Sequence, residues 1–168
     1  AGAALKGAGR IIAVGTRAAS IEVAKSYGAT DIVSYKKGDI VEQIVDMTNG
    51  GVKKAIIAGG NADTFRQAIQ MTLPMGTIAN VNFFDVKDML SMPALTWGLG
   101  MSNKDIRCGF CPGGRARVEH LMELIKYGRI DPTKIITHKF HGFDKIEDAF
   151  HLMDSKTPEL IKPIVYID

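Results

Sequence analysis

The stretch IIAVGTRAAS, residues 11–20, decides the fold. It begins with an almost wholly apolar run, 11–15, and turns polar at once with Thr16 and Arg17. A run that is apolar on both faces is typical of a strand in a parallel sheet, because helices cover both sides of such a sheet. A helical pattern over 18–27 follows and ends at Gly28. The stretch therefore predicts a buried strand followed by a covering helix.

The same alternation continues to about residue 90. The helix over 39–47 opens with the capping-box spacing of Asp39 and Glu42. A repeated strand–helix–strand order indicates right-handed crossovers and hence a parallel sheet. We predict an α/β fold with a Rossmann-type parallel sheet, built from strands at 11–14, 31–35, 52–58 and 77–83, helices at 18–27, 39–47 and 63–72, and a turn at 74–76.

The regular rhythm loosens after this point. We place a domain boundary near 111–114, so that residues 1–111 form the first domain and residues 112–168 are an α+β segment of a second domain. The elements expected here are strands at 105–110, 135–140 and 164–167, and helices at 115–127 and 144–153.

Composition and charge exclude several classes of protein. The net charge of +3 is mild and no basic run exceeds two residues, so neither nucleic acid nor an anionic membrane is an expected partner. No apolar run approaches the roughly 18 residues that a membrane helix needs. Two cysteines are too few for a disulfide framework, which favours a reducing, cytoplasmic setting.

Arg17 raises the first functional hypothesis, because ligands of a doubly wound sheet bind beyond the carboxyl ends of its strands. An acidic residue after the second strand favours NAD, whereas an arginine suits the extra 2′-phosphate of NADP. Tyr35 ends the next strand, 18 positions after Arg17, so the two residues can meet around one phosphate. Thr16 adds a hydroxyl donor. The alternative interpretation is that Arg17 is an ordinary solvated arginine in a loop.

The glycine turn that binds a dinucleotide pyrophosphate, G-x-G-x-x-G, does not occur in the sequence. If 11–14 is the second strand of the sheet, the first strand precedes residue 1, and residues 1–9 are the tail of the first helix. In the strand order 3-2-1-4-5-6, the strands at 11–14 and 52–58 then lie on either side of the position of that first strand. Because the chain also begins with Ala1 rather than Met, we expect a longer working protein, or else pairing between copies of the chain.

Several motifs together resemble the NADP-dependent secondary alcohol dehydrogenases of the zinc-dependent medium-chain family. The resemblance covers nearly the whole chain and implies roughly the carboxyl-terminal half of such an enzyme. The motifs that carry it are GAGRIIAVGTR, YGATDIVSYK, AIIAGGNAD, GTIANVN, CPGGR, THKFHGFDKIEDAF and LIKP.

The resemblance implies two groups of cofactor-binding residues. Thr16, Arg17, Tyr35 and Lys156 match the positions that hold the 2′-phosphate. The family often has Tyr where this chain has Phe83, which lacks the hydroxyl. Residues near the ribose and nicotinamide are Gly59, Gly60, Asn61 and Asn82.

The resemblance also implies properties of the whole enzyme. It implies NADP as cofactor, secondary alcohols or ketones as substrates, a catalytic zinc, and a homotetramer that pairs near Asp105. The zinc ligands and catalytic residues precede residue 1 in the family, so no residue of this chain is assigned to either, and the chain alone is expected to be inactive. A zinc-free NADPH-dependent quinone or enone reductase is the alternative enzyme, and a non-catalytic nucleotide-binding module is a further one.

Cys108 and Cys111 form a C-x-x-C pair between a strand and a helix, which fits a thioredoxin-like redox site. Half a zinc site is a second interpretation, but the chain has no other cysteine pair. The resembling family usually has glycine at position 108, which favours an incidental pair of small residues at the end of a buried strand.

Overall fold

The computed structural model describes residues 1–167. They form two compact units, one of residues 1–36 together with the described residues from 114 onward, and one of residues 37–113. One limit, Gly114, lies in the region where the sequence placed its domain boundary. The assignment of residues 1–111 to a single domain stays a prediction.

The first unit begins with a parallel strand pair. β1 (Ile12–Val14) and β2 (Asp31–Val33) are connected by α2 (Ala18–Ser26), and the register sets Val14 opposite Val33. The short helix α1 (Gly2–Leu5) precedes β1, in agreement with the predicted tail of a helix. The expected strand over 31–35 is too long, because Tyr35 begins the 3-10 helix η1 (Tyr35–Lys37).

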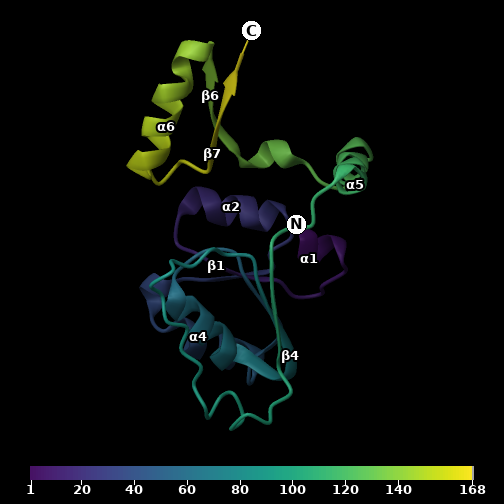
Figure 1. The fold of residues 1–168 in the computed structure, drawn as a ribbon, viewed down its shortest axis with the longest axis vertical. Helices are drawn as coiled ribbons and strands as arrows, with labels where there is room; N and C mark the ends of the chain where they lie inside the picture. The colour runs from purple at the N-terminus through teal and green to yellow at the C-terminus, as the bar shows by residue number, and fades with distance from the viewer. Residues whose placement is uncertain (168) are drawn as a thin grey trace. The chain divides into compact units, whose positions relative to one another are not determined.

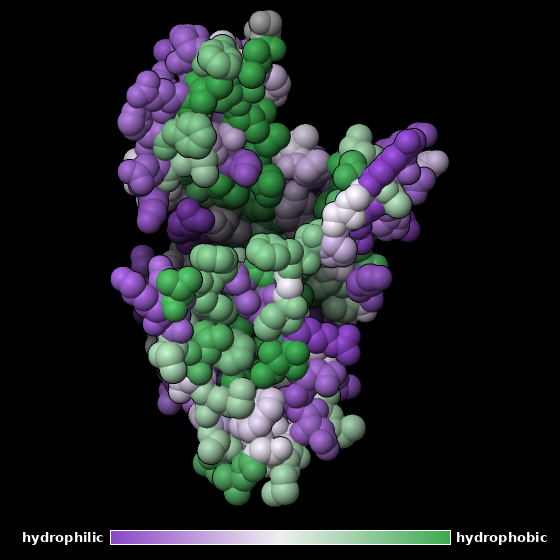
Figure 2. All heavy atoms as spheres, viewed as in Figure 1, coloured by the Kyte–Doolittle hydropathy of each residue, from purple (hydrophilic) through white to green (hydrophobic). Residues whose placement is uncertain are grey.

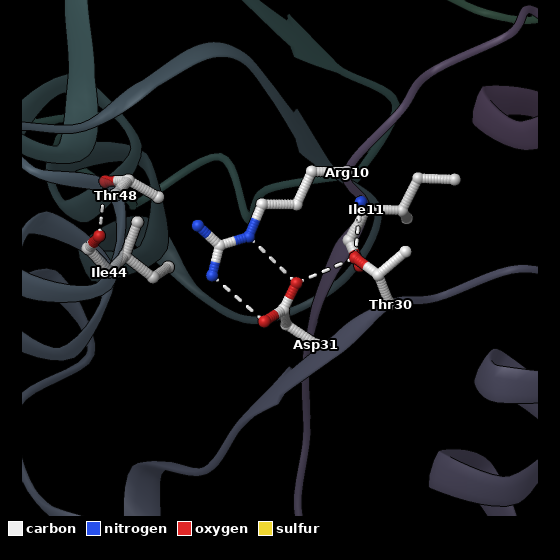
Figure 3. A network of polar contacts seen from close by, with 6 residues as sticks. All are labelled: Arg10, Ile11, Thr30, Asp31, Ile44 and Thr48. Atoms are coloured by element: carbon white, nitrogen blue, oxygen red, sulfur yellow. Dashed lines mark hydrogen bonds and ion pairs between the residues drawn. The ribbon is translucent and has the colours of Figure 1, made fainter.

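An ion pair ties the entry of β1 to the entry of β2 (Figure 3). The Arg10 guanidinium donates to both carboxylate oxygens of Asp31, each at 2.9 Å. The Thr30 hydroxyl donates to Asp31 at 2.7 Å, and it also accepts the backbone N–H of Ile11 at 2.9 Å. These bonds hold the register in which both strands end at the same edge.

The carboxyl-terminal part of the first unit is a second parallel pair. β6 (Ile136–His141) and β7 (Lys162–Tyr166) are joined through η3 (Phe143–Lys145) and α6 (Ile146–Ser155), and Figure 1 shows α6 beside the two strands. Ahead of them lie α5 (Arg115–Lys126) and η2 (Pro132–Ile135). Four apolar residues of α5 are exposed rather than packed: Val118, Leu121, Met122 and Ile125.

The second unit contains a three-stranded parallel sheet in the order β3-β4-β5. Its elements are α3 (Ile40–Thr48), β3 (Val52–Ile57), α4 (Ala62–Met71), β4 (Thr72–Asn80) and β5 (Asp105–Cys108). Phe65, Ala68 and Ile69 of α4 recur at helical spacing and are buried against this sheet. The core that they complete also contains Ala55, Ile57 and Ile78.

Two expectations for the second unit were wrong. The turn expected at 74–76 lies inside β4, where Val52 pairs with Thr72 but Lys54 already pairs with Thr77, so the extra residues of β4 bulge out. Met75 in this bulge has a φ of 60°. Cys108 does not end a buried strand, because β5 is an edge strand and both cysteines are exposed.

Parallel pairing throughout confirms the predicted α/β class. In the strand order 3-2-1-4-5-6, the observed pairs β1-β2, β3-β4 and β4-β5 correspond to the pairs 2-3, 4-5 and 5-6. Among the described residues, β1 and β3 each have a single strand partner. The absence of a first strand between them stays a prediction. No helix within residues 1–167 has the length and apolar character of a membrane span.

Candidate nucleotide-binding site

The carboxyl ends of β1 and β2 bring two predicted site residues together. Val14 is opposite Val33, where both strands end, and Thr16 and Tyr35 each follow two positions later. The Thr16 hydroxyl donates to the Tyr35 hydroxyl at 2.7 Å. Tyr35 is 57% exposed, so the pair is open to a ligand. We call the residues Thr16, Arg17 and Tyr35 the carboxyl edge of β1 and β2.

Arg17 lies between Thr16 and the first residue of α2, where its extended backbone makes it the N-cap residue. Its Nη1 donates to the backbone carbonyl of Leu160 at 3.1 Å. A guanidinium and two hydroxyls at one edge are strong partners for phosphate oxygens, because charge-assisted hydrogen bonds are shorter and stronger than neutral ones. The electrostatics of this edge therefore favour an anionic group.

Lys156 belongs to the segment that Arg17 contacts. It ends α6 in the left-handed conformation, with φ 49° and ψ 39°, and its side chain is exposed. Leu160 follows four positions later, at the end of a turn. The Leu160 N–H closes this turn by donating to the Thr157 carbonyl at 3.1 Å. The structure thus connects the Lys156 segment to the carboxyl edge through Arg17.

The second group of predicted residues lies in the second unit, after β3. Asn61 caps α4: its Oδ1 accepts the N–H groups of Asp63 at 3.1 Å and Thr64 at 3.4 Å, and the Thr64 hydroxyl accepts the Asn61 N–H at 3.2 Å. Gly60 has a φ of 101°, and a Cβ there would lie 2.2 Å from the Thr64 hydroxyl oxygen. Glycine is therefore required at 60, and the Asn61 side chain is already engaged in starting the helix.

Asn82 approaches the same turn from the end of β4. Its Nδ2 donates to the Gly60 carbonyl at 3.4 Å, which brings together two predicted residues that are 22 positions apart. Gly59 is exposed between β3 and Gly60. The residues predicted to lie near the ribose and nicotinamide thus form one local cluster.

Asn80 is a residue that the sequence reasoning missed. It is buried at the end of β4, where its Nδ2 donates to the Asn82 carbonyl at 2.9 Å and its Oδ1 accepts the Asn82 N–H at 3.2 Å. This reciprocal pair fixes the backbone from which the Asn82 side chain extends. The signal in the sequence was an amide residue inside an apolar strand, since buried amides need partners.

The chain does not supply a metal centre within the part that the structure describes. Residues 1–167 contain no group of three or more His, Cys, Asp or Glu side chains placed to hold a metal ion. Cys108 and Cys111 are free thiols at the surface of the second unit.

The comparisons with known proteins identify the class. The family model described as zinc-binding dehydrogenase matches residues 1–127, and the chain belongs to this family. The resemblance found in the sequence motifs is thereby confirmed.

Two of the matching relatives are NADP-dependent isopropanol dehydrogenases. The chain is 56% identical over 168 residues to the NADP-dependent isopropanol dehydrogenase of Thermoanaerobacter brockii, covering 99% of this chain and 48% of the relative. It is 50% identical to the protein of the same name from Clostridium beijerinckii, again over 99% of this chain and 48% of the relative. The chain therefore spans about half the length of these curated relatives.

A solved structure agrees with the fold. The crystal structure of benzyl alcohol dehydrogenase from Acinetobacter calcoaceticus matches 99% of this chain and 45% of its own, with a TM-score of 0.84 and 26% sequence identity. This similarity confirms the predicted Rossmann-type architecture.

Proposed function

We propose that the chain is the NADP-binding portion of a longer alcohol dehydrogenase that interconverts secondary alcohols and ketones. The observation that carries the proposal is the hydrogen bond between Thr16 and Tyr35 at the carboxyl edge, with Arg17 directly adjoining Thr16. The similarity to two NADP-dependent isopropanol dehydrogenases supports the choice of cofactor and substrate class.

The carboxyl edge fits the adenosine end of NADP. The Arg17 guanidinium and the Tyr35 hydroxyl donate to the 2′-phosphate, and the exposed Lys156 ammonium contributes a further positive charge. The Thr16 hydroxyl has one proton, so it donates to the phosphate when that proton turns away from the Tyr35 hydroxyl. NAD has a free 2′-hydroxyl in place of this phosphate and cannot use these donors in the same way. The positive charge and the several hydrogen-bond donors of the carboxyl edge therefore favour NADP over NAD.

The cluster in the second unit serves the other half of the cofactor. A Cβ at Gly59 would meet nothing within 4 Å, so a ligand can approach the backbone there, and Asn82 offers an amide nearby. Gly60 serves the turn itself, since the Thr64 side chain fills the space beside it. Asn61 contributes to this cluster indirectly. Its side chain caps α4 and so fixes the backbone where the helix begins. When bound, the nicotinamide supplies hydride transfer, while these residues hold it in place.

The remaining properties of the enzyme belong to the same proposal. The family implies a catalytic zinc, but the residues described here do not form its site, and no step of the reaction is assigned through it. The working enzyme is a cytoplasmic homotetramer, and the 168-residue chain by itself is catalytically inactive.

The proposal predicts a cofactor-specific effect of Arg17→Asp. The change replaces a donor to the 2′-phosphate by a repelling charge, so NADPH binding should weaken by about 1.5–3 kcal/mol, which is roughly 10- to 150-fold. NADH binding should change little. The measurement is the dissociation constant of each cofactor for the full-length protein, determined by fluorescence titration.

Arg115→Asp is the matched control, because this arginine is exposed on α5 and pairs with Glu119 at 2.6 Å. It should leave both constants unchanged. Equal weakening of NADPH and NADH by Arg17→Asp, or no weakening of either, would remove the role proposed for Arg17.

A further inference from the structure

Arg17 is held by a residue 143 positions away in the sequence. Its Nη1 donates to the Leu160 carbonyl at 3.1 Å, and this bond is partly buried. A guanidinium carries five N–H donors, so the others remain for a phosphate. Arginine is also among the side chains that lose most rotamer freedom when they are ordered. A bond that already orients Arg17 therefore removes part of the cost of binding the phosphate.

The Leu160 carbonyl is itself fixed from both sides. The Leu160 side chain is only 5% exposed, and its N–H closes the turn onto Thr157. The N–H of the next residue, Ile161, belongs to the same peptide group as the Leu160 carbonyl. It donates to the Thr137 hydroxyl at 3.0 Å. One peptide group thus connects Arg17 on one side with Thr137 on the other.

Thr137 is free to make this contact because it lies in a bulge of β6. Ile136 pairs with Lys162, but His138 already pairs with Pro163, so Thr137 is the extra residue. Its hydroxyl oxygen also accepts the Lys162 N–H, at 3.3 Å. A side chain thus holds the backbone between the turn and β7, where the ladder of hydrogen bonds is interrupted.

We propose that Thr137 is a positioning residue for cofactor selectivity. Through the Leu160–Ile161 peptide it holds the carbonyl that orients Arg17 toward the 2′-phosphate. The inference rests on the proposed function, since it assigns Thr137 to the same nucleotide site. Thr137 acts on NADP alone, because only the 2′-phosphate uses the guanidinium that this chain of contacts orients.

The test compares Thr137→Val with Thr137→Ser in the full-length protein. Valine keeps the shape of threonine but lacks the hydroxyl, whereas serine keeps the hydroxyl. Thr137 is exposed, so neither change empties a core position. Thr137→Val should weaken NADPH binding by about 2- to 12-fold, the range expected when one flexible side chain loses its pre-organisation. NADH binding should stay unchanged, and Thr137→Ser should bind both cofactors like the parent protein.

A second variant tests the route through Arg17. Lysine at position 17 has no fork of donors to share between a carbonyl and a phosphate. In the Arg17→Lys protein, adding Thr137→Val should therefore produce no further loss of NADPH affinity. Equal loss of NADPH and NADH with Thr137→Val, equal behaviour of the valine and serine variants, or an undiminished loss in the Arg17→Lys background would each overturn the inference.

The two proposals fail in different ways. If Arg17→Asp leaves NADPH binding intact, the proposed function is wrong. If Arg17→Asp weakens NADPH but Thr137→Val does not, the nucleotide site stands and only the positioning role of Thr137 is lost.

Discussion

Thr16 and Tyr35 are 19 positions apart, yet their hydroxyls lie 2.7 Å from one another. At the scale of single residues, this contact could be expected from the sequence. Both residues follow predicted parallel strands, and the carboxyl ends of parallel strands lie at the same edge of a sheet. The contact of Arg17 with Leu160 had no such signal, because a backbone carbonyl at the end of a distant turn leaves no mark in side-chain patterns. Asn80 did leave a signal, an amide inside an apolar strand, but its partner Asn82 could be named only once the end of β4 was placed.

Asp31 predicts how stability depends on pH. The hydrogen bond from Arg10, with a smaller effect from Thr30, lowers the pKa of Asp31 from 3.8 to about 2. Because the folded protein has the lower pKa, the stabilisation by the Arg10–Asp31 ion pair is fully present above the ordinary pKa of an aspartate. It is lost as the pH falls from about 4 toward about 2. The difference in urea midpoint between the parent chain and Asp31→Asn should therefore shrink across this window.

Arg10→Gln is the control for this prediction, since it removes the donor that depresses the pKa of Asp31. It should abolish most of the pH dependence without changing the carboxyl group itself. A midpoint difference between the parent chain and Asp31→Asn that stays constant from neutral pH down to the acid limit would contradict the account.

At the scale of elements, most helices and strands could be predicted because apolar periodicity reports the face that an element buries. α4 shows this well, since Phe65, Ala68 and Ile69, which recur at helical spacing, are the residues that reach the core. The exceptions have physical reasons. Pro74 and Gly76 are typical of a turn, but the pairing of β4 with β3 absorbs them as a bulge. The strand ending at Tyr35 is shortened because η1 begins there.

The cap of α4 allows a prediction about Asn61. Removing its Oδ1 leaves two N–H groups at the start of the helix without their acceptor. Asn61→Ala should lower the free energy of unfolding by about 0.5–2 kcal/mol, while Asn61→Ser should retain most of it because serine is also a good cap. Urea denaturation followed by circular dichroism measures both. An alanine variant as stable as the parent would show that the cap contributes nothing.

At the scale of the whole molecule, the described chain leaves unusual amounts of apolar surface exposed. Figure 2 shows hydrophobic residues at the surface. Four residues on the loop after β4 are at least 79% exposed: Phe83, Val86, Met89 and Leu95. Leu121 and Met122 of α5 are 40% and 58% exposed. β1 and β3 each pair with one strand among the described residues. Surfaces and edges of this kind promote association.

The isolated 168-residue chain is therefore expected to self-associate. Gel filtration with light scattering should give a mass well above 18.2 kDa, and the thermal transition should be broad. Leu121→Glu should reduce the association, whereas Glu123→Gln on the same helix should not. A monodisperse 18.2 kDa species with a cooperative melt would contradict this expectation.

The central claim is that the carboxyl edge of β1 and β2 binds a phosphate on the adenosine ribose. The most direct test is a crystal structure of the full-length protein with adenosine 2′,5′-bisphosphate, which carries that phosphate without the nicotinamide. We predict the 2′-phosphate within hydrogen-bond distance of the Thr16 hydroxyl, the Arg17 guanidinium and the Tyr35 hydroxyl. Density for the 2′-phosphate at any other place, with these three groups left in solvent, would contradict the account.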